Sequence, residues 1–96
     1  MIVECIYTGT GRQRAVFLGP ELVGGRFVLD LMDGDDACVE TSFAPLAEVR
    51  RGRADWHPFE GGLGGSLEGL TALRVKVRRC DGWVKLTVWG EDKDAQ

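Results

Sequence analysis

The chain has 96 residues, 44% of them hydrophobic and 28% charged, and its formal net charge is −3. Such a composition is typical of one small globular domain and argues against disorder. No apolar run approaches the roughly 20 residues that cross a bilayer, and the opening residues MIVECIY lack the basic start of a signal peptide. We therefore expect a cytoplasmic protein that is not embedded in a membrane.

The N-terminal half of the chain predicts two hairpin-like units. The opening residues MIVECIY predict a strand that begins at the first residue, turn residues follow in TGTGR, and residues 13–19 return as a second strand. The stretch GPELVGG is typical of a loop. Residues 26–32 and 37–43 then predict two strands around the turn DGDD, because apolar side chains recur at every second position in both.

A short helix is predicted next, over SFAPLAEVRRG. Ser42 is suited to cap its start, Leu46 and Val49 share a face, and Gly52 is suited to end it. Two arginines fall near its C-terminal end, where cations interact favourably with the helix dipole.

The stretch LRVKVRRCDGWVKLTVWG, residues 73–90, predicts a final hairpin. Asp-Gly favours the type I′ turn, and that register places Val77 opposite Leu86 and Val75 opposite Val88, so these four side chains should fill the core. Three such units indicate a mainly β fold, an antiparallel sandwich or open barrel of about six strands with one short helix. We assign residues 1–90 to this single domain and residues 91–96 to a polar tail.

The glycine-rich run EGGLGGSLEG, residues 60–69, is similar to a phosphate-binding loop in composition only. A Walker-type loop needs a Lys and a following helix, whereas here two glutamates would repel phosphate. We predict a loose, exposed connection. Trp56, His57 and Phe59 precede it, and they would form the rim of a small-molecule site if the sheets made an open barrel.

Cysteine and histidine residues are too few and too scattered to predict a metal or a cofactor. Cys5, Cys38 and Cys80 lack the spacing of metal ligands, and His57 is the only histidine. Asp55 and Ser66 lie near His57 in the sequence, but nothing indicates that they act as its orienting acid and nucleophile, so no catalytic residue is predicted. The sequence favours a protein that is not an enzyme.

Charged residues supply two candidate partner-binding surfaces. An acidic tip of Asp33, Asp35 and Asp36 would steer the protein onto a basic partner, and replacing all three by Lys should slow association without unfolding the protein. The outer face of the predicted final hairpin combines cationic side chains with Trp, and its register places Arg74 opposite Trp89. This basic Trp face suits a protein partner, a single nucleic-acid strand or solvent alone, and its residues are Arg74, Lys76, Arg78, Lys85 and Trp89.

From Phe43 onward the chain resembles small bacterial domains and the WapI-like immunity proteins of polymorphic toxin systems. The resemblance covers about half of the chain and is carried by FAPLAEV, Trp56, FEGG, SLEG, LTALRVKV, CDG and WVKLTVW. In such proteins a short helix precedes a Trp-containing loop, a strand start like SLEG and a final Asp-Gly hairpin. The resemblance implies a binding protein whose surface neutralises another molecule, and it brings no catalytic residues.

The hypothesis that these observations favour is a non-enzymatic protein-binding module, an immunity-type or inhibitor protein that occludes a toxin or nuclease-like partner. A phage-borne inhibitor of a bacterial defence complex would use the same surfaces. Two further alternatives stay open. One is a single-stranded nucleic-acid-binding module that uses the basic Trp face, and the other is a small barrel that binds a small molecule at the Trp56 rim.

Overall fold

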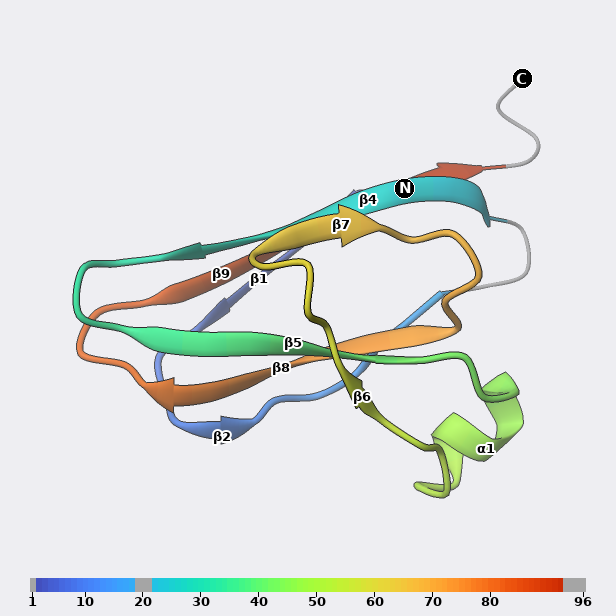
Figure 1. Cartoon of the computed structure of the whole chain (residues 1–96), viewed down its shortest axis with the longest axis horizontal. Helices are drawn as coiled ribbons and strands as arrows, with labels where there is room; N and C mark the ends of the chain where they lie inside the picture. The colour runs from blue at the N-terminus through green and yellow to red at the C-terminus, as the bar shows by residue number, and fades with distance from the viewer. Residues whose placement is uncertain (1, 19–21, 93–96) are drawn as a thin grey trace.

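The computed structural model describes residues 2–18 and 22–92 as two antiparallel sheets that face each other, with a short helix, α1, at one side (Figure 1). The β9 sheet has the strand order β1-β9-β4-β7, and the β8 sheet has the order β2-β8-β5-β6, with β3 also paired with β8. The mainly β sandwich predicted from the sequence is confirmed. The elements are β1 (Ile2–Tyr7), β2 (Gly11–Arg12), β3 (Val16–Phe17), β4 (Leu22–Leu31), β5 (Asp36–Ser42), α1 (Leu46–Arg50), β6 (His57–Pro58), β7 (Gly64–Ser66), β8 (Ala72–Arg79) and β9 (Val84–Asp92).

The three connections predicted as hairpin turns each carry the chain from one sheet to the other. β1 pairs with β9, whereas β2 and β3, which follow it, pair with β8. Likewise β4 pairs with β9 while β5 pairs with β8, and β8 and β9 themselves belong to different sheets. The predicted hairpins are therefore wrong, because successive strands face each other across the core instead of sharing hydrogen bonds.

The turn at Asp81-Gly82 has a different backbone from the predicted one. A type I′ turn needs positive φ at both central residues. Among the described residues only glycines have positive φ, and Gly82 is not one of them. Gly82 instead lies against Met32, since a Cβ there would stand 2.5 Å from the Met32 sulfur. The β4–β5 and β8–β9 connections thus pack together at one end of the sandwich.

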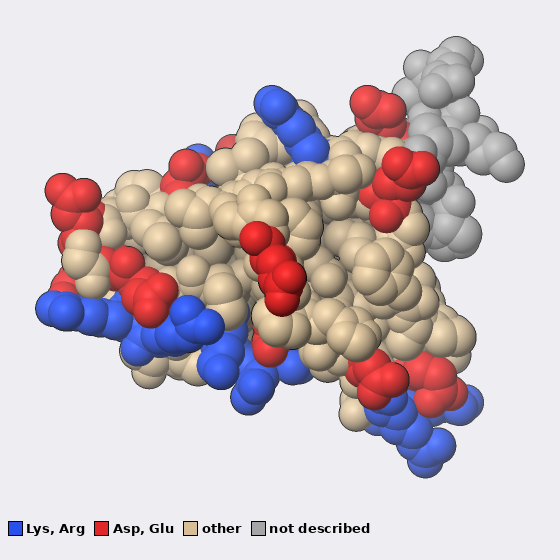
Figure 2. Space-filling view, in the orientation of Figure 1, with Lys and Arg blue, Asp and Glu red and all other residues tan. Residues whose placement is uncertain are grey.

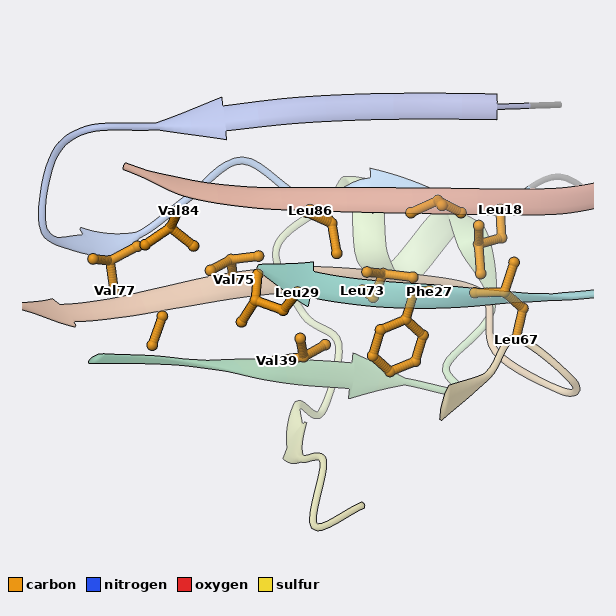
Figure 3. Close-up of a cluster of buried hydrophobic side chains, with 12 residues drawn as sticks. Leu18, Phe27, Leu29, Val39, Leu67, Leu73, Val75, Val77, Val84 and Leu86 are labelled. Atoms are coloured by element: carbon orange, nitrogen blue, oxygen red, sulfur yellow. The ribbon is translucent and has the colours of Figure 1, made fainter. Parts of the chain in front are cut away.

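The core lies between the two sheets and consists mainly of the inward-facing side chains of β4, β5, β8 and β9 (Figure 3). Val75 and Val77 on β8 and Leu86 and Val88 on β9 are at most 2% exposed, so their predicted place in the core is confirmed. Burying one such side chain contributes about 1.5–3 kcal/mol. The core is completed by Leu18, Phe27, Leu29, Ala37, Val39, Leu67, Leu73 and Val84.

The segment from β6 to β7 closes one side of the sandwich, because it passes from the β8 sheet to the β9 sheet. β6 pairs with β5, and β7 pairs with β4. Between them the Phe59 ring packs edge-to-face on Phe27, with ring centroids 5.0 Å apart. A Cβ on Gly61 or Gly65 would collide with the Phe59 ring. The predicted loose connection is therefore wrong for β7, although residues 61–63 are exposed as expected.

Helix α1 ends as the sequence predicts but begins differently. Gly52 has a φ of +72°. Its N–H donates to the carbonyl of Val49, and the next N–H donates to that of Glu48, which is a Schellman arrangement. Ser42 is not the cap, because it is the last residue of β5. Pro45 occupies the cap position without a side-chain hydrogen bond.

Three predicted boundaries are corrected by the structure. The return strand over residues 13–19 is replaced by the two short strands β2 and β3, and residue 19 lies outside the described ranges. The predicted loop GPELVGG ends early, because β4 already includes its last four residues. β9 continues to Asp92 and is paired with β4 there, so only residues 93–96, which are not described, are left to the predicted tail. No helix in the described ranges is long and apolar enough to cross a bilayer.

Candidate partner-binding surface

The residues predicted as one basic Trp face lie on opposite sides of the molecule. Arg74, Lys76 and Arg78 occupy the outward positions of β8, whereas Lys85 and Trp89 occupy those of β9 in the other sheet. A hairpin would bring these side chains to one face, but a change of sheet sends them to two opposite faces. The predicted platform for a single nucleic-acid strand is therefore not formed.

An Arg guanidinium lies over the ring of Trp56 and another lies over the ring of Trp89. The predicted contact between Arg74 and Trp89 is wrong. The Arg74 guanidinium carbon lies 4.2 Å from the centroid of the Trp56 ring, and that of Arg26 lies 5.0 Å from the centroid of Trp89. Contacts of this kind contribute about 0.5–1 kcal/mol at exposed sites. They also hold a flat cation in one orientation.

The acidic tip lies at the β4–β5 connection, where two of its three carboxylates are engaged. Asp35 accepts hydrogen bonds from the backbone N–H of Asp81 at 2.7 Å and of Gly82 at 3.3 Å. Asp36 lies 3.6 Å from Arg78, and Asp33 is exposed. Asp35 therefore helps to hold the β8–β9 connection, and a variant that replaces all three acids will disturb the fold as well as the tip.

Replacing Asp35 by Ala should lower the free energy of unfolding by about 1–2 kcal/mol, because two backbone N–H groups lose a charged acceptor. Urea unfolding of the variant measures this loss. Asp33→Ala, in the same turn but exposed, is the matched control and should change stability by less than about 0.5 kcal/mol. Equal effects of the two variants would show that the Asp35 hydrogen bonds do not hold the connection.

A cluster that sequence reasoning did not find lies on the outer face of the β8 sheet. Glu40 on β5 is the register partner of Arg74 on β8. Its Oε1 accepts hydrogen bonds from the Nε of Arg74 at 2.8 Å and from the Nε of Arg12 at 3.2 Å. Since Trp56 stacks on Arg74, we name Arg12, Glu40, Trp56 and Arg74 the Glu40 cluster. It joins β2, β8, β5 and the chain that leads to β6.

Glu40 is only 8% exposed although it lies on an outer face. Burial by itself would raise the pKa of its carboxyl, but the hydrogen bonds and charges of Arg74 and then Arg12 outweigh this effect and lower the pKa from its usual value. The carboxylate is therefore ionised at neutral pH, and it orients both guanidinium groups. Two cations around one anion leave the cluster positively charged.

Cations gather on this side of the molecule (Figure 2). Most Lys and Arg side chains in this view lie along the lower side, which the β8 sheet and α1 form, whereas the side of the β9 sheet carries mainly acidic and uncharged residues. The chain as a whole has a net charge of −3. A cationic face on an acidic protein is a segregation of charge that can orient an approaching partner.

The sequence contained one signal for Glu40. Ala37, Val39 and Thr41 alternate and face inward, so Glu40 faces outward, beside the outward side chains of whichever strand pairs with β5. The alternation does not say which strand that is. Arg12 gave no signal, because it lies in a strand of only two residues.

Trp56, His57 and Phe59 do not line one rim. Phe59 packs on Phe27 in the core, and Trp56 lies over Arg74 on the outer face. His57 is exposed, and its carbonyl accepts a hydrogen bond from the Thr41 hydroxyl at 3.4 Å. The predicted ligand rim is therefore wrong, because the Phe59 ring faces the core whereas the Trp56 ring lies on the outer face of the β8 sheet.

The three cysteines are free thiols, each half-buried and each in a different part of the fold. Cys80 lies 3.8 Å from the Asp35 carboxylate, and burial followed by the negative charge of Asp35 raises the pKa of its thiol. In the part of the chain that the structure describes, no three His, Cys, Asp or Glu side chains come together as a metal ion would require.

Comparison of the chain with protein-family models, with curated proteins and with solved structures gave no match. The candidate surface therefore rests on its geometry alone: a fixed Arg–Trp contact, a buried carboxylate and an excess of positive charge.

Proposed function

We propose that this protein is a non-enzymatic protein-binding module that acts as an immunity-type or inhibitor protein and occludes its partner. The observation that carries the proposal is the Glu40 cluster. Trp and Arg side chains dominate the binding energy of many protein interfaces, and here Arg74 is held between the Glu40 carboxylate and the Trp56 ring. A side chain fixed before binding loses less rotamer freedom when a partner arrives.

Exposed apolar side chains on β1 also support a protein partner. β1 is an edge strand of the β9 sheet, and its outward residues Ile2 and Ile6 are 68% and 66% exposed. Glu4 between them lies 3.7 Å from Lys85. Large apolar side chains on an exposed edge strand are typical of interaction surfaces. They give the module apolar contact area on the side away from the Glu40 cluster.

An immunity protein of a toxin system and a phage-borne inhibitor of a defence complex would use the same contacts. The resemblance from Phe43 onward to WapI-like immunity proteins favours the first. The neighbouring genes separate the two, because an adjacent toxin gene supports immunity and adjacent phage structural genes support inhibition of a defence complex.

The test begins with capture of the partner from an extract of the source cells and continues with the purified pair. Adding the protein should abolish the activity of the partner at a stoichiometric ratio. Trp56→Ala should weaken binding by about 30-fold or more, as expected for a hot-spot Trp. Trp89→Ala is the matched control, since it also removes a half-buried Trp with an Arg on its ring, but from the opposite sheet.

Two results would overturn the proposal. The first is a captured partner that stays fully active when saturated with this protein. The second is an equal loss of binding in the two Trp variants while both remain folded, because the Glu40 cluster would then have no special part in recognition.

A further inference from the structure

Part of the hydrogen-bonding capacity of the Glu40 cluster is unused. Arg12 and Arg74 reach the Glu40 carboxylate through their Nε atoms. Among the residues that the structure describes, the Nη groups of neither side chain meet an acceptor. An Arg fork presents two parallel donors to a carboxylate when its Nη groups are available. The cluster therefore holds two guanidinium groups in place and leaves their terminal donors for another molecule.

The residues around the Glu40 cluster also carry more positive than negative charge. Lys76 lies directly opposite Arg12 in the register of β2 and β8, and like charges opposite each other destabilise a sheet. Lys76 has no ion-pair partner in the described part of the chain. Arg12 and Arg74 thus share one carboxylate, that of Glu40, and Lys76 has none, which leaves two positive charges uncompensated. An anionic group bound there would remove the repulsion.

We infer that the partner presents an acidic polypeptide segment to this face, with carboxylates that bind Arg12, Arg74 and Lys76. The inference rests on the proposed function and names the chemistry of the partner. Arg74 and Lys76 are outward neighbours on β8, so they lie about 6.5 Å apart along the strand. An extended segment with Asp or Glu at every second position repeats at the same distance. Such a segment would place one carboxylate at each cation.

A nucleic-acid strand fits this face less well. Single-strand binding relies on aromatic side chains on which bases stack. Trp89 lies on β9 in the other sheet, and Trp83 lies in the connection just before it. Trp56, on this side, is in contact with Arg74. The same outer face also carries the exposed Phe17 of β3, but an Arg lies over that ring too, with the Arg50 guanidinium carbon 5.8 Å from its centroid.

The experiment measures binding of a fluorescein-labelled peptide of about twelve residues in which Glu alternates with Thr. The double variant R12A/K76A should weaken binding by about tenfold or more. R26A/K85A removes the same two residue types from the outer face of the other sheet, and it should weaken binding less than about threefold. A peptide with Gln in place of Glu should not bind. Thermal melting checks that both double variants remain folded.

Three outcomes would overturn the inference. One is an absence of Glu-peptide binding at low salt, and another is an equal loss in the two double variants. The third is tighter binding of a thymidine oligonucleotide of equal charge, lost in R12A/K76A, which would assign the face to nucleic acid. If the peptide fails while the captured partner is still occluded, only the chemistry of the partner is wrong. If the peptide binds as expected but no partner is occluded, the proposed function fails.

Discussion

Replacing Gly25 by Ala is expected to lower the free energy of unfolding by at least about 3 kcal/mol. Gly25 has a φ of +131°, and a Cβ there would lie inside van der Waals contact with the backbone carbonyl oxygen of Trp89. Backbone cannot move aside as a flexible side chain can. The clash falls between β4 and β9, near the point where the register of the two strands shifts. Thermal melting should show a decrease of about 12 °C or more.

Gly9→Ala is the control for this variant. A Cβ on Gly9 meets no atom within 4 Å, and its φ is not in the left-handed region. Its stability should therefore stay within about 0.5 kcal/mol of the original. If Gly25→Ala melts at the same temperature as Gly9→Ala, then the close approach of β4 to β9 at Trp89 is not a feature of the protein in solution.

Replacing Glu40 by Gln is expected to destabilise the protein by about 2 kcal/mol at neutral pH. The change leaves Arg74, whose side chain is only 21% exposed, without its anionic partner. Breaking a buried ion pair costs about 3–5 kcal/mol, and the loss here is smaller because Arg12 and part of Arg74 reach water. Urea unfolding at neutral pH measures the difference.

The same variant should change the dependence of stability on pH. Because the pKa of Glu40 is lower in the folded protein than in the unfolded chain, its contribution is fully present above the ordinary carboxyl pKa of about 4.3 and is lost as the pH falls through the folded value. The difference between the original protein and Glu40→Gln should therefore shrink as the pH is lowered from about 5 to about 3. A difference that stays constant over this range would show that folding does not lower the pKa of Glu40.

Asp36→Asn is the control for Glu40. Asp36 lies on the same strand and forms an ion pair with Arg78, but both side chains are more than half exposed. Solvent screens such a pair, so its loss should cost less than about 0.5 kcal/mol at any pH in this range.

The alternation in the sequence was sufficient to predict which side chains are buried but not which strands pair. Val75 and Val77 face the core, and so do Leu86 and Val88, in the predicted hairpin and in the observed sandwich alike. In both arrangements the two strands bury one side against the same core. The local pattern is therefore identical, and the difference lies in pairings between distant segments, which alternation does not encode.

Because alternation does not show which strands pair, the sequence could not predict which residues meet in the Glu40 cluster. Arg74 and Trp56 could each be singled out as charged or aromatic residues of interest, but their contact depends on β6 lying beside β5 and on β5 lying beside β8. Glu40 joins the cluster only through that order of strands. The predicted surface of Arg74 with Lys85 and Trp89 failed for the opposite reason, since it assumed that β8 and β9 are neighbours in one sheet.

The position of β9 bears on how the protein is made. β9 lies between β1 and β4 in its sheet, and it is the last of the described strands to leave the ribosome. At about 5–20 residues per second, these 96 residues take roughly 5–20 s to synthesise. During most of that time β1 has no strand to pair with, and its exposed apolar side chains are open to other nascent chains. The β8 sheet contains no β9, so its strands are all synthesised earlier, whereas the β9 sheet is completed only when synthesis of β9 is finished. Folds that are rich in such long-range pairings form in milliseconds to seconds.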